Sequence, residues 1–263
     1  MKNRLDKEIV ERNLVPSRSK SQELINSSLV KVNDKIINKC NFMVSSSDII
    51  TILDNDKLKY VSRGGLKLEK AIIEFKIDFK GKRVMDIGSS TGGFCDCALK
   101  HGASFIRAID VGTNLLHSSL RNDSRIELHE QTNFKDLEHK YFTDIDIMTC
   151  DVSFISLIKI IEKISLENVK VDMICLIKPQ FECGKEIATK YKGIILDKSV
   201  HYEIINRIIK ELNILNFYLK NITYSPIKGG DGNIEYLCYI NNKEKTNIKF
   251  DVKELINKAF KSK

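Results

Sequence analysis

From about residue 65 to residue 240, apolar runs of strand length alternate with stretches of helical spacing, and this alternation constrains the fold most. Regular alternation of this kind is typical of a mostly parallel sheet with helices on both faces. The last two expected strands, near 217–224 and 234–240, are joined by a glycine-rich segment without a helix, which predicts an antiparallel pair at one edge. We therefore expect an α/β domain. Its expected helices cover 65–76, 93–101, 157–165 and 199–214, and its other expected strands cover 83–87, 104–109, 125–129, 145–150 and 172–177.

Two of these strands end in ionisable residues of opposite charge. Met173–Ile177 runs directly into Lys178, and Ile145–Cys150 runs directly into Asp151. The carboxyl ends of strands in an open α/β sheet are where ligands bind. Burial disfavours a charged ammonium group, so a lysine at such a position suits proton handling. Because ionisable groups cluster at such places for chemistry more often than for stability, we favour a catalytic pair over a single structural salt bridge.

The segment Arg83–Phe94 begins with an expected strand, continues as a glycine-rich loop and leads into a helix. Its glycine spacing, beginning at Gly88, does not match the dinucleotide fingerprint, and Asp86 places a carboxylate where a pyrophosphate would lie. Negative charge there favours a cofactor with a cationic centre and no phosphate, namely S-adenosylmethionine, over NAD. The next strand ends in Asp110, which can hold both ribose hydroxyls. The combination indicates a Rossmann-type methyltransferase, with a glycine loop that binds nothing as the alternative.

The acceptor of the methyl group decides which catalytic groups are needed. A ribose hydroxyl is a poor nucleophile unless a base draws its proton away. Lys178, made neutral by burial and a neighbouring cation, is our candidate for that base, and Asp151 would lie between the sulfonium and the acceptor. Lys67 and Glu235 would complete a charge-balanced set.

Residues 1–53 predict a small separate domain of two helices followed by short strands. The inner faces of the helices would consist of Leu5, Ile9, Val10 and Leu14 in the first and Leu24, Ile25 and Leu29 in the second. Basic side chains of this domain are candidates for contacts with RNA phosphates: Arg4, Arg18, Lys20 and Lys31. A linker over 54–61 would join this domain to the second, 62–263, where Arg63 is a further candidate.

The formal net charge of +8 is unevenly distributed. Residues 1–40 hold nine Lys and Arg against five Asp and Glu, and residues 242–263 hold seven against three. Basic ends suggest a polyanion partner such as nucleic acid, although lysine-rich composition alone is the alternative.

No apolar run has membrane-spanning length and no signal peptide is apparent, so we expect a cytoplasmic protein without membrane contact. The seven cysteines lack zinc-site spacing, so we expect no metal.

Several segments resemble the TlyA-type rRNA ribose methyltransferases, the haemolysin-A family, whose catalytic domain is FtsJ-like. They are SRGGLKLEKA, DIGSSTGGF, DVGTNLLH, LRNDSRI, QTN, DVSFISL, LIKPQFECGK, SPIKG and GNIEY. The N-terminal LDKEIVERNLVPSRSKSQELI is similar to the small RNA-binding domain named from ribosomal protein S4. These matches occur in order along nearly the whole chain.

The resemblance implies a catalytic tetrad at Lys67, Asp151, Lys178 and Glu235, and cofactor contacts at Gly88, Ser89, Thr91, Gly92, Asp110 and Asn133. It implies that the substrate is a cytidine 2′-hydroxyl in 16S rRNA, 23S rRNA or both, on ribosomal subunits. The linker departs from the family pattern, because no aromatic-rich signature precedes Tyr60. Two other hypotheses are a membrane-active haemolysin and a non-catalytic ribosome assembly factor.

Overall fold

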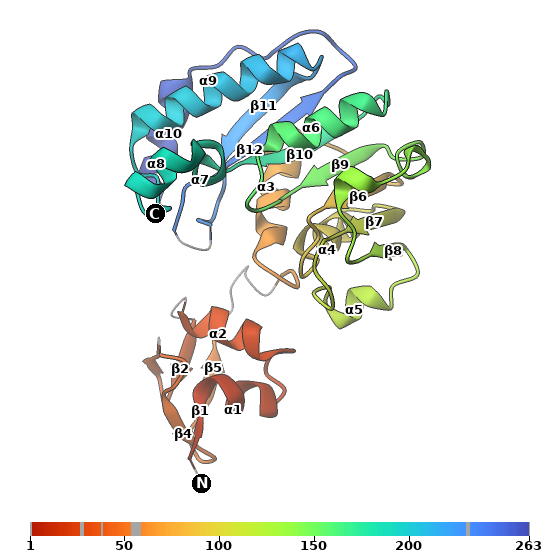
Figure 1. Ribbon diagram of the computed structural model, residues 1–263. Helices are drawn as coiled ribbons and strands as arrows, with labels where there is room; N and C mark the ends of the chain where they lie inside the picture. The colour runs from red at the N-terminus through yellow and green to blue at the C-terminus, as the bar shows by residue number, and fades with distance from the viewer. Residues whose placement is uncertain (1, 27–28, 38, 54–58, 230–231, 263) are drawn as a thin grey trace. The chain divides into compact units, whose positions relative to one another are not determined.

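The computed structural model describes residues 2–26, 29–37, 39–53, 59–229 and 232–262. The chain divides into two compact units, Met1–Ser62 and Arg63–Lys263 (Figure 1). Most of the expected linker, residues 54–58, lies outside the described residues.

The first unit combines two short helices with two small antiparallel sheets. Its helices are α1 (Leu5–Glu11) and α2 (Arg18–Asn26). Its strands are β1 (Lys2–Arg4), β2 (Val30–Val32), β3 (Lys35–Ile36), β4 (Met43–Ser45) and β5 (Ile50–Ile52). Strand β1 pairs with β4, and β2 lies between β3 and β5. Two helices followed by short strands were expected from the sequence, whereas β1, which precedes both helices, was not.

Apolar side chains from both helices and from β2 and β4 form the core of this unit, with Leu5, Ile9, Leu24, Ile25, Val30 and Val44 fully buried. The prediction that Leu14 belongs to the inner face of the first helix was wrong. Helix α1 ends at Glu11, so the helical spacing does not reach Leu14, whose side chain is 41% exposed. Val10 and Leu29 are only partly buried against the core.

The second unit is built on a seven-stranded sheet with the order β11-β12-β10-β9-β6-β7-β8. Its strands are β6 (Arg83–Ile87), β7 (Phe105–Ile109), β8 (Ile126–His129), β9 (Ile147–Cys150), β10 (Asp172–Ile177), β11 (Tyr218–Tyr224) and β12 (Tyr236–Asn241). Strands β6 to β10 are parallel to one another, and β12 is antiparallel to both β10 and β11. The predicted α/β class and the antiparallel pair at one edge are therefore confirmed.

Helices cover both faces of this sheet (Figure 1). Helices α3 (Gly64–Phe75) and α4 (Gly93–Lys100) pack together on one face. Helices α6 (Leu157–Leu166), α9 (Lys198–Ile214) and α10 (Val252–Lys261) cover the other. Short helical segments occupy connections: α5 (Ser118–Arg121), η2 (Phe134–Asp136), η3 (His139–Tyr141), α7 (Pro179–Glu182) and α8 (Gly184–Lys190). Apolar residues of α10 are buried against α9 and β11, so the basic C-terminal segment is integrated into this unit.

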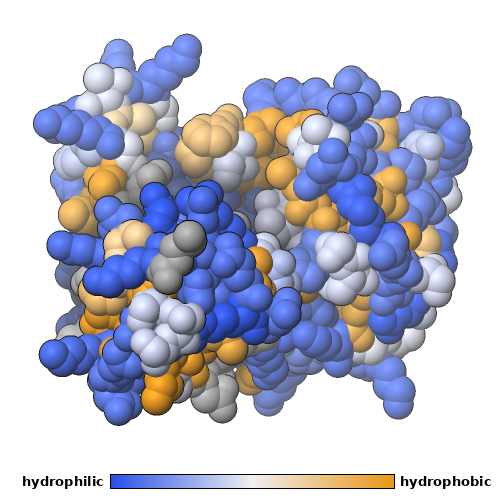
Figure 2. Space-filling model, turned by 90° about the horizontal axis from the view of Figure 1, so that it is seen from below, coloured by the Kyte–Doolittle hydropathy of each residue, from blue (hydrophilic) through white to orange (hydrophobic). Residues whose placement is uncertain are grey.

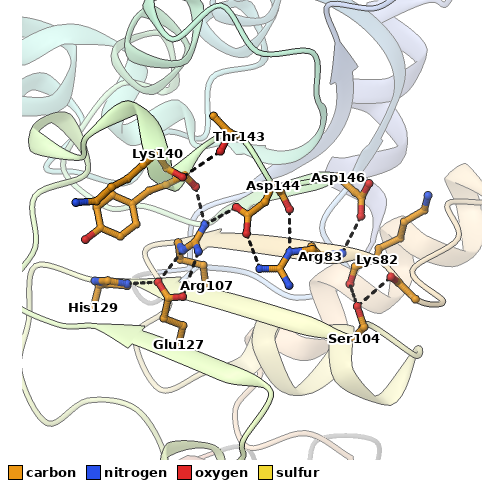
Figure 3. Close-up of polar contacts among 12 residues, drawn as sticks. Lys82, Arg83, Ser104, Arg107, Glu127, His129, Lys140, Thr143, Asp144 and Asp146 are labelled. Carbon is orange, nitrogen blue, oxygen red and sulfur yellow. Dashed lines mark hydrogen bonds and ion pairs between the residues drawn. The ribbon is translucent and has the colours of Figure 1, made fainter.

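An ion-pair network joins β6, β7 and β8 to the segment before β9 (Figure 3). Arg107 on β7 is 6% exposed and donates to both carboxylate oxygens of Glu127 on β8, at 2.8 and 3.1 Å. It also donates to the Tyr141 carbonyl at 2.7 Å and to Asp144 Oδ1 at 2.8 Å. The other oxygen of Asp144 accepts from Arg83. One buried guanidinium thus connects three separate parts of the unit.

This network makes stability depend on pH in a defined direction. The hydrogen bond from Arg107, opposed by burial, lowers the pKa of Glu127 to about 2, against about 4.3 in an unfolded chain. The resulting stability is fully present above the unfolded pKa and is lost as the pH falls toward 2. We expect Glu127→Gln to lower the urea midpoint of unfolding at pH 7, and we expect the difference from wild type to shrink below pH 3. An unchanged difference across this range would contradict the assignment.

On the face shown in Figure 2, hydrophilic residues predominate and hydrophobic residues form small separate patches. Within the described residues, no helix is both long and apolar enough to cross a membrane.

Candidate active site

Four strand-end and helix residues meet at the carboxyl edge of the sheet in the second unit. Asp151 directly follows β9 and Lys178 directly follows β10, and these strands are neighbours. Lys67 lies in the first turn of α3, and Glu235 directly precedes β12, which pairs with β10. The sheet topology therefore brings together residues that are as much as 168 positions apart in the chain.

These four side chains form a continuous series of ion pairs. Lys178 Nζ is 2.6 Å from Asp151 Oδ1, and Lys67 Nζ donates to the other oxygen of Asp151 at 3.1 Å. Lys67 Nζ also donates to Glu235 Oε2 at 2.7 Å. Lys67, Lys178 and Glu235 are each less than 8% exposed. The structure thus contains the four predicted tetrad residues as one buried cluster.

Burial and mutual charge compete within this cluster. Burial alone would raise the pKa of Asp151, but the ammonium groups of Lys67 and Lys178 outweigh burial and lower it. Burial alone would lower the pKa of Lys67, but Asp151 and Glu235 outweigh burial and raise it. Asp151 therefore stays ionised and Lys67 stays protonated near neutral pH.

A cavity of about 430 Å³ opens beside Asp151. Three predicted cofactor residues line it: Gly88, Asp110 and Asn133. Asp151, predicted as a catalytic residue, also lines it. The remaining lining residues were not singled out from the sequence, and they include Ser90, Val111, Gly112, Thr132, Phe134 and Ser153. Asp110 accepts hydrogen bonds from the backbone N–H groups of Ser90 and Gly112, both at 2.7 Å, which fixes its carboxylate at the cavity wall.

The cavity fits S-adenosylmethionine in two respects. Gly88 has a φ of +82°, and a Cβ there would lie 3.0 Å from Val152 Cγ1, so only glycine keeps the wall open. The neighbouring Ser89 is 4% exposed, and its hydroxyl has no hydrogen-bond partner among the described residues. A buried hydroxyl without a partner is costly, so a polar ligand group beside this loop would satisfy it.

Four predicted cofactor residues do not line the cavity: Asp86, Ser89, Thr91 and Gly92. Asp86 is 1% exposed, and it accepts hydrogen bonds from Thr149 Oγ1 at 2.7 Å and from Cys95 Sγ at 3.0 Å. Burial raises the pKa of Asp86 to about 6. Its side chain thus joins β6 to β9 and α4 beneath the loop instead of facing the ligand space. Gly92, with a φ of +90°, is the N-cap residue that directly precedes α4.

We expect Gly88→Ala to weaken cofactor binding roughly tenfold, which corresponds to about 1.4 kcal/mol. The added methyl would press on Val152 and on the Asp151 carbonyl, which lies 3.3 Å away. Calorimetric titration with S-adenosylmethionine would measure the loss. Gly184→Ala is the matched control, because Gly184 also has a positive φ, of +78°, but no atom lies within 4 Å of the added Cβ. Equal effects of both substitutions would contradict the role of Gly88.

The cavity also has an exposed aromatic residue that no sequence pattern singles out. Phe154 lines the cavity with its side chain 90% exposed, and its φ of +64° is rare for a bulky residue. Its ring centroid is 5.0 Å from that of Phe181, three residues after Lys178. Strained backbone and an exposed ring are typical of ligand contacts. The exposure of its side chain and its backbone φ are the features that identify this residue as a candidate ligand contact.

The predicted RNA-contacting residues differ in what they present to solvent. Arg4 and Arg18 both donate to the buried carboxylate of Asp6 and remain 40% and 50% exposed. The hydrogen bond from Arg4, opposed by burial, lowers the pKa of Asp6, which stays ionised. Lys31 and Arg63 are half-buried, whereas Lys20 is only 6% exposed and has little surface for a phosphate.

Comparison with known proteins gives consistent matches over most of the chain. A model described as FtsJ-like methyltransferase matches residues 60–242, and the S4 domain model matches residues 3–50. Hemolysin A of Brachyspira hyodysenteriae is 42% identical over 239 residues, which are 90% of this chain and 98% of that protein. The 23S rRNA (cytidine-2′-O)-methyltransferase TlyA of Campylobacter jejuni is 38% identical over 247 residues, which are 88% of this chain and 96% of that protein. A solved structure described as "Putative hemolysin from Streptococcus thermophilus" is 34% identical, with a TM-score of 0.78 over 99% of this chain and 96% of that one.

Proposed function

Because the chain belongs to the FtsJ-like methyltransferases, we propose that it methylates a ribose 2′-hydroxyl of ribosomal RNA with S-adenosylmethionine as methyl donor. The target is a cytidine in 23S rRNA, 16S rRNA or both, presented on a ribosomal subunit in the cytoplasm. The observation that carries this proposal is the buried Lys67–Asp151–Lys178–Glu235 cluster beside a cavity that fits the cofactor.

In this mechanism S-adenosylmethionine supplies a methyl group on a positively charged sulfur. Gly88 and Asp110 would hold the cofactor, and the Ser89 hydroxyl would be free to hydrogen-bond one of its polar groups. Lys178, in its neutral form, would accept the proton of the 2′-hydroxyl while that oxygen forms a bond to the methyl carbon and the bond between this carbon and sulfur breaks. With Lys178 neutral, Lys67 carries one positive charge against the two negative charges of Asp151 and Glu235. The resulting net negative charge stabilises the cationic donor in the cavity.

The first unit contributes RNA binding. Its S4 domain match and the half-exposed Arg4 and Arg18 support this role. Lys31 adds positive charge to this unit, and Arg63 adds it at the start of the second unit. Phosphate contacts of this kind position an RNA without reading its sequence. We assign base-specific contacts to the catalytic unit instead.

Phe154 is our candidate for the base of the target nucleotide, because its exposed ring lines the same cavity as Asp151. A base extruded from folded RNA is held by stacking on aromatic side chains, worth about 1–3 kcal/mol per base. We expect Phe154→Ala to lower kcat/KM for the rRNA substrate about tenfold. The cofactor dissociation constant should change little, and Phe154→Tyr should retain most activity. Equal losses in Phe154→Ala and Phe154→Tyr would contradict stacking.

The experiment that tests the function uses methyl-tritiated S-adenosylmethionine with small and large ribosomal subunits from a strain that lacks this protein. We expect label in rRNA with wild type and none with Lys178→Ala. Because a 2′-O-methyl group blocks attack by that oxygen on the adjacent phosphate, the labelled nucleotide should survive alkaline hydrolysis as part of a dinucleotide. Label in alkali-labile mononucleotides would place the methyl group on a base and contradict the proposal.

Two other functions give different results in the same experiment. Two similar proteins carry hemolysin names, and a membrane-active protein would release vesicle contents regardless of the Lys178→Ala substitution. A non-catalytic assembly factor would bind subunits without transferring label. The buried tetrad and the adjoining cavity favour methyl transfer over both.

A further inference from the structure

Glu182 is a buried carboxylate near the tetrad to which the mechanism above gives no role. It ends α7, four residues after Lys178, and its side chain is 2% exposed. Its backbone N–H donates to the carbonyl of Lys178 at 3.2 Å, so the two residues belong to the same turn. Glu182 is therefore tied to the backbone of Lys178.

The same carboxylate also holds the neighbouring strand-end loop. Its Oε1 accepts from the backbone N–H of Leu157 at 2.7 Å, and its Oε2 accepts from the hydroxyl of Ser156 at 2.8 Å. Ser156 is the N-cap of α6 and ends the loop that begins at Asp151. One side chain thus connects the loop that carries Asp151 to the turn that carries Lys178.

Arg207 from α9 supports this connection. Its Nη2 donates to the carbonyl of Glu182 at 2.6 Å and lies 3.6 Å from Glu182 Oε2. Burial raises the pKa of Glu182, while the hydrogen bonds from Leu157 and Ser156 oppose this shift. A buried carboxylate that accepts two hydrogen bonds and lies beside a guanidinium group is ordered, because each of these contacts restricts its rotamer.

We propose that Glu182 is a positioning residue for methyl transfer, which keeps Lys178 within ion-pair distance of Asp151 by joining their two loops. This inference rests on the proposed function. Lys178 Nζ and Asp151 Oδ1 are 2.6 Å apart, and small displacements of reacting groups are costly to catalysis. A residue that only stabilised α6 would leave this distance, and hence kcat, unchanged once the protein is folded.

The test compares Glu182→Ala, Glu182→Gln and the control Glu162→Gln, which changes a half-exposed carboxylate of α6. Glu182→Ala removes both acceptors. Glu182→Gln keeps one acceptor for the Leu157 N–H and offers an amide donor to Ser156. We expect kcat to fall 10- to 100-fold in Glu182→Ala and to recover to within about threefold of wild type in Glu182→Gln. The KM for rRNA and the cofactor dissociation constant should stay within about threefold in all variants.

A second measurement does not require activity. In protein with ¹⁵N-labelled lysine side chains, Glu182→Ala should shift the Lys178 resonance, identified by its loss in Lys178→Met, whereas Glu162→Gln should not. An unshifted resonance, or an unchanged kcat in folded Glu182→Ala, would overturn the role of Glu182. Failure of wild type to label rRNA would overturn the proposed function instead, while a shifted resonance would still support the loop connection.

Discussion

Lys178→Met is expected to reduce methyl transfer to rRNA about 10³-fold while leaving cofactor binding within a few-fold of wild type. A general base contributes roughly 10²- to 10⁴-fold to a rate, and methionine keeps the length of the side chain without a proton acceptor. The side chain of Lys178 is 8% exposed and pairs with Asp151, so solvent water has little access to take over the role of the amine. Single-turnover transfer of labelled methyl groups and calorimetry with S-adenosylmethionine would measure the two quantities.

The control for this prediction is Lys159→Met on α6. Lys159 pairs with Glu162 at the surface, where its side chain is 55% exposed, and its loss should leave the rate unchanged. A Lys178→Met protein with near wild-type transfer would remove Lys178 from the chemistry. A variant that had lost cofactor binding as well would show that Lys178 builds the cavity instead.

Arg107→Met is expected to lower the free energy of unfolding by about 3 kcal/mol. The substitution removes the buried cation that both Glu127 and Asp144 contact, and it leaves the carbonyl of Tyr141 without its hydrogen bond from Arg107. We place the loss at the lower end of the range for buried ion pairs, because both carboxylates remain partly solvated. Urea unfolding followed by circular dichroism would measure it.

Arg125→Met provides the comparison, since Arg125 pairs with Asp123 and its side chain is 48% exposed. Its loss should cost less than about 1 kcal/mol. Equal destabilisation by the two substitutions would mean that the burial of Arg107 adds nothing to the strength of its contacts.

Strands of the second unit were predictable because their apolar runs are long and bounded by charged or glycine residues. Apolar runs do not fix the first residue of a strand, as β9 shows. Ile145–Cys150 was expected to be extended throughout, but β9 begins at Ile147. Just before it, Asp146 bonds to Arg83 with both its backbone N–H and its side chain. Strands β1 and β4 pair with each other across forty residues, and neither has the apolar alternation that would reveal it.

The tetrad was predictable for a different reason. Strand ends of a parallel sheet share one edge, so Asp151 and Lys178 could be placed together from chain order alone. The direction of a side chain at such an edge is decided by local partners, and no pattern encodes it. Thr149 and Cys95 turn Asp86 away from the cavity, whereas a positive φ turns Phe154 outward.

The contact between Lys67 and Glu235 closes a segment of 168 residues, and β12 enters the sheet between β10 and β11. Contacts between residues so distant in sequence form late during folding, because the entropy cost of closing the loop precedes the favourable energy of the contact. A partly folded chain can therefore acquire the cofactor loop, which is local, well before it acquires a complete tetrad. During refolding, recovery of S-adenosylmethionine binding should precede recovery of methyl transfer. The delay between the two would measure when β12 pairs with its neighbouring strands.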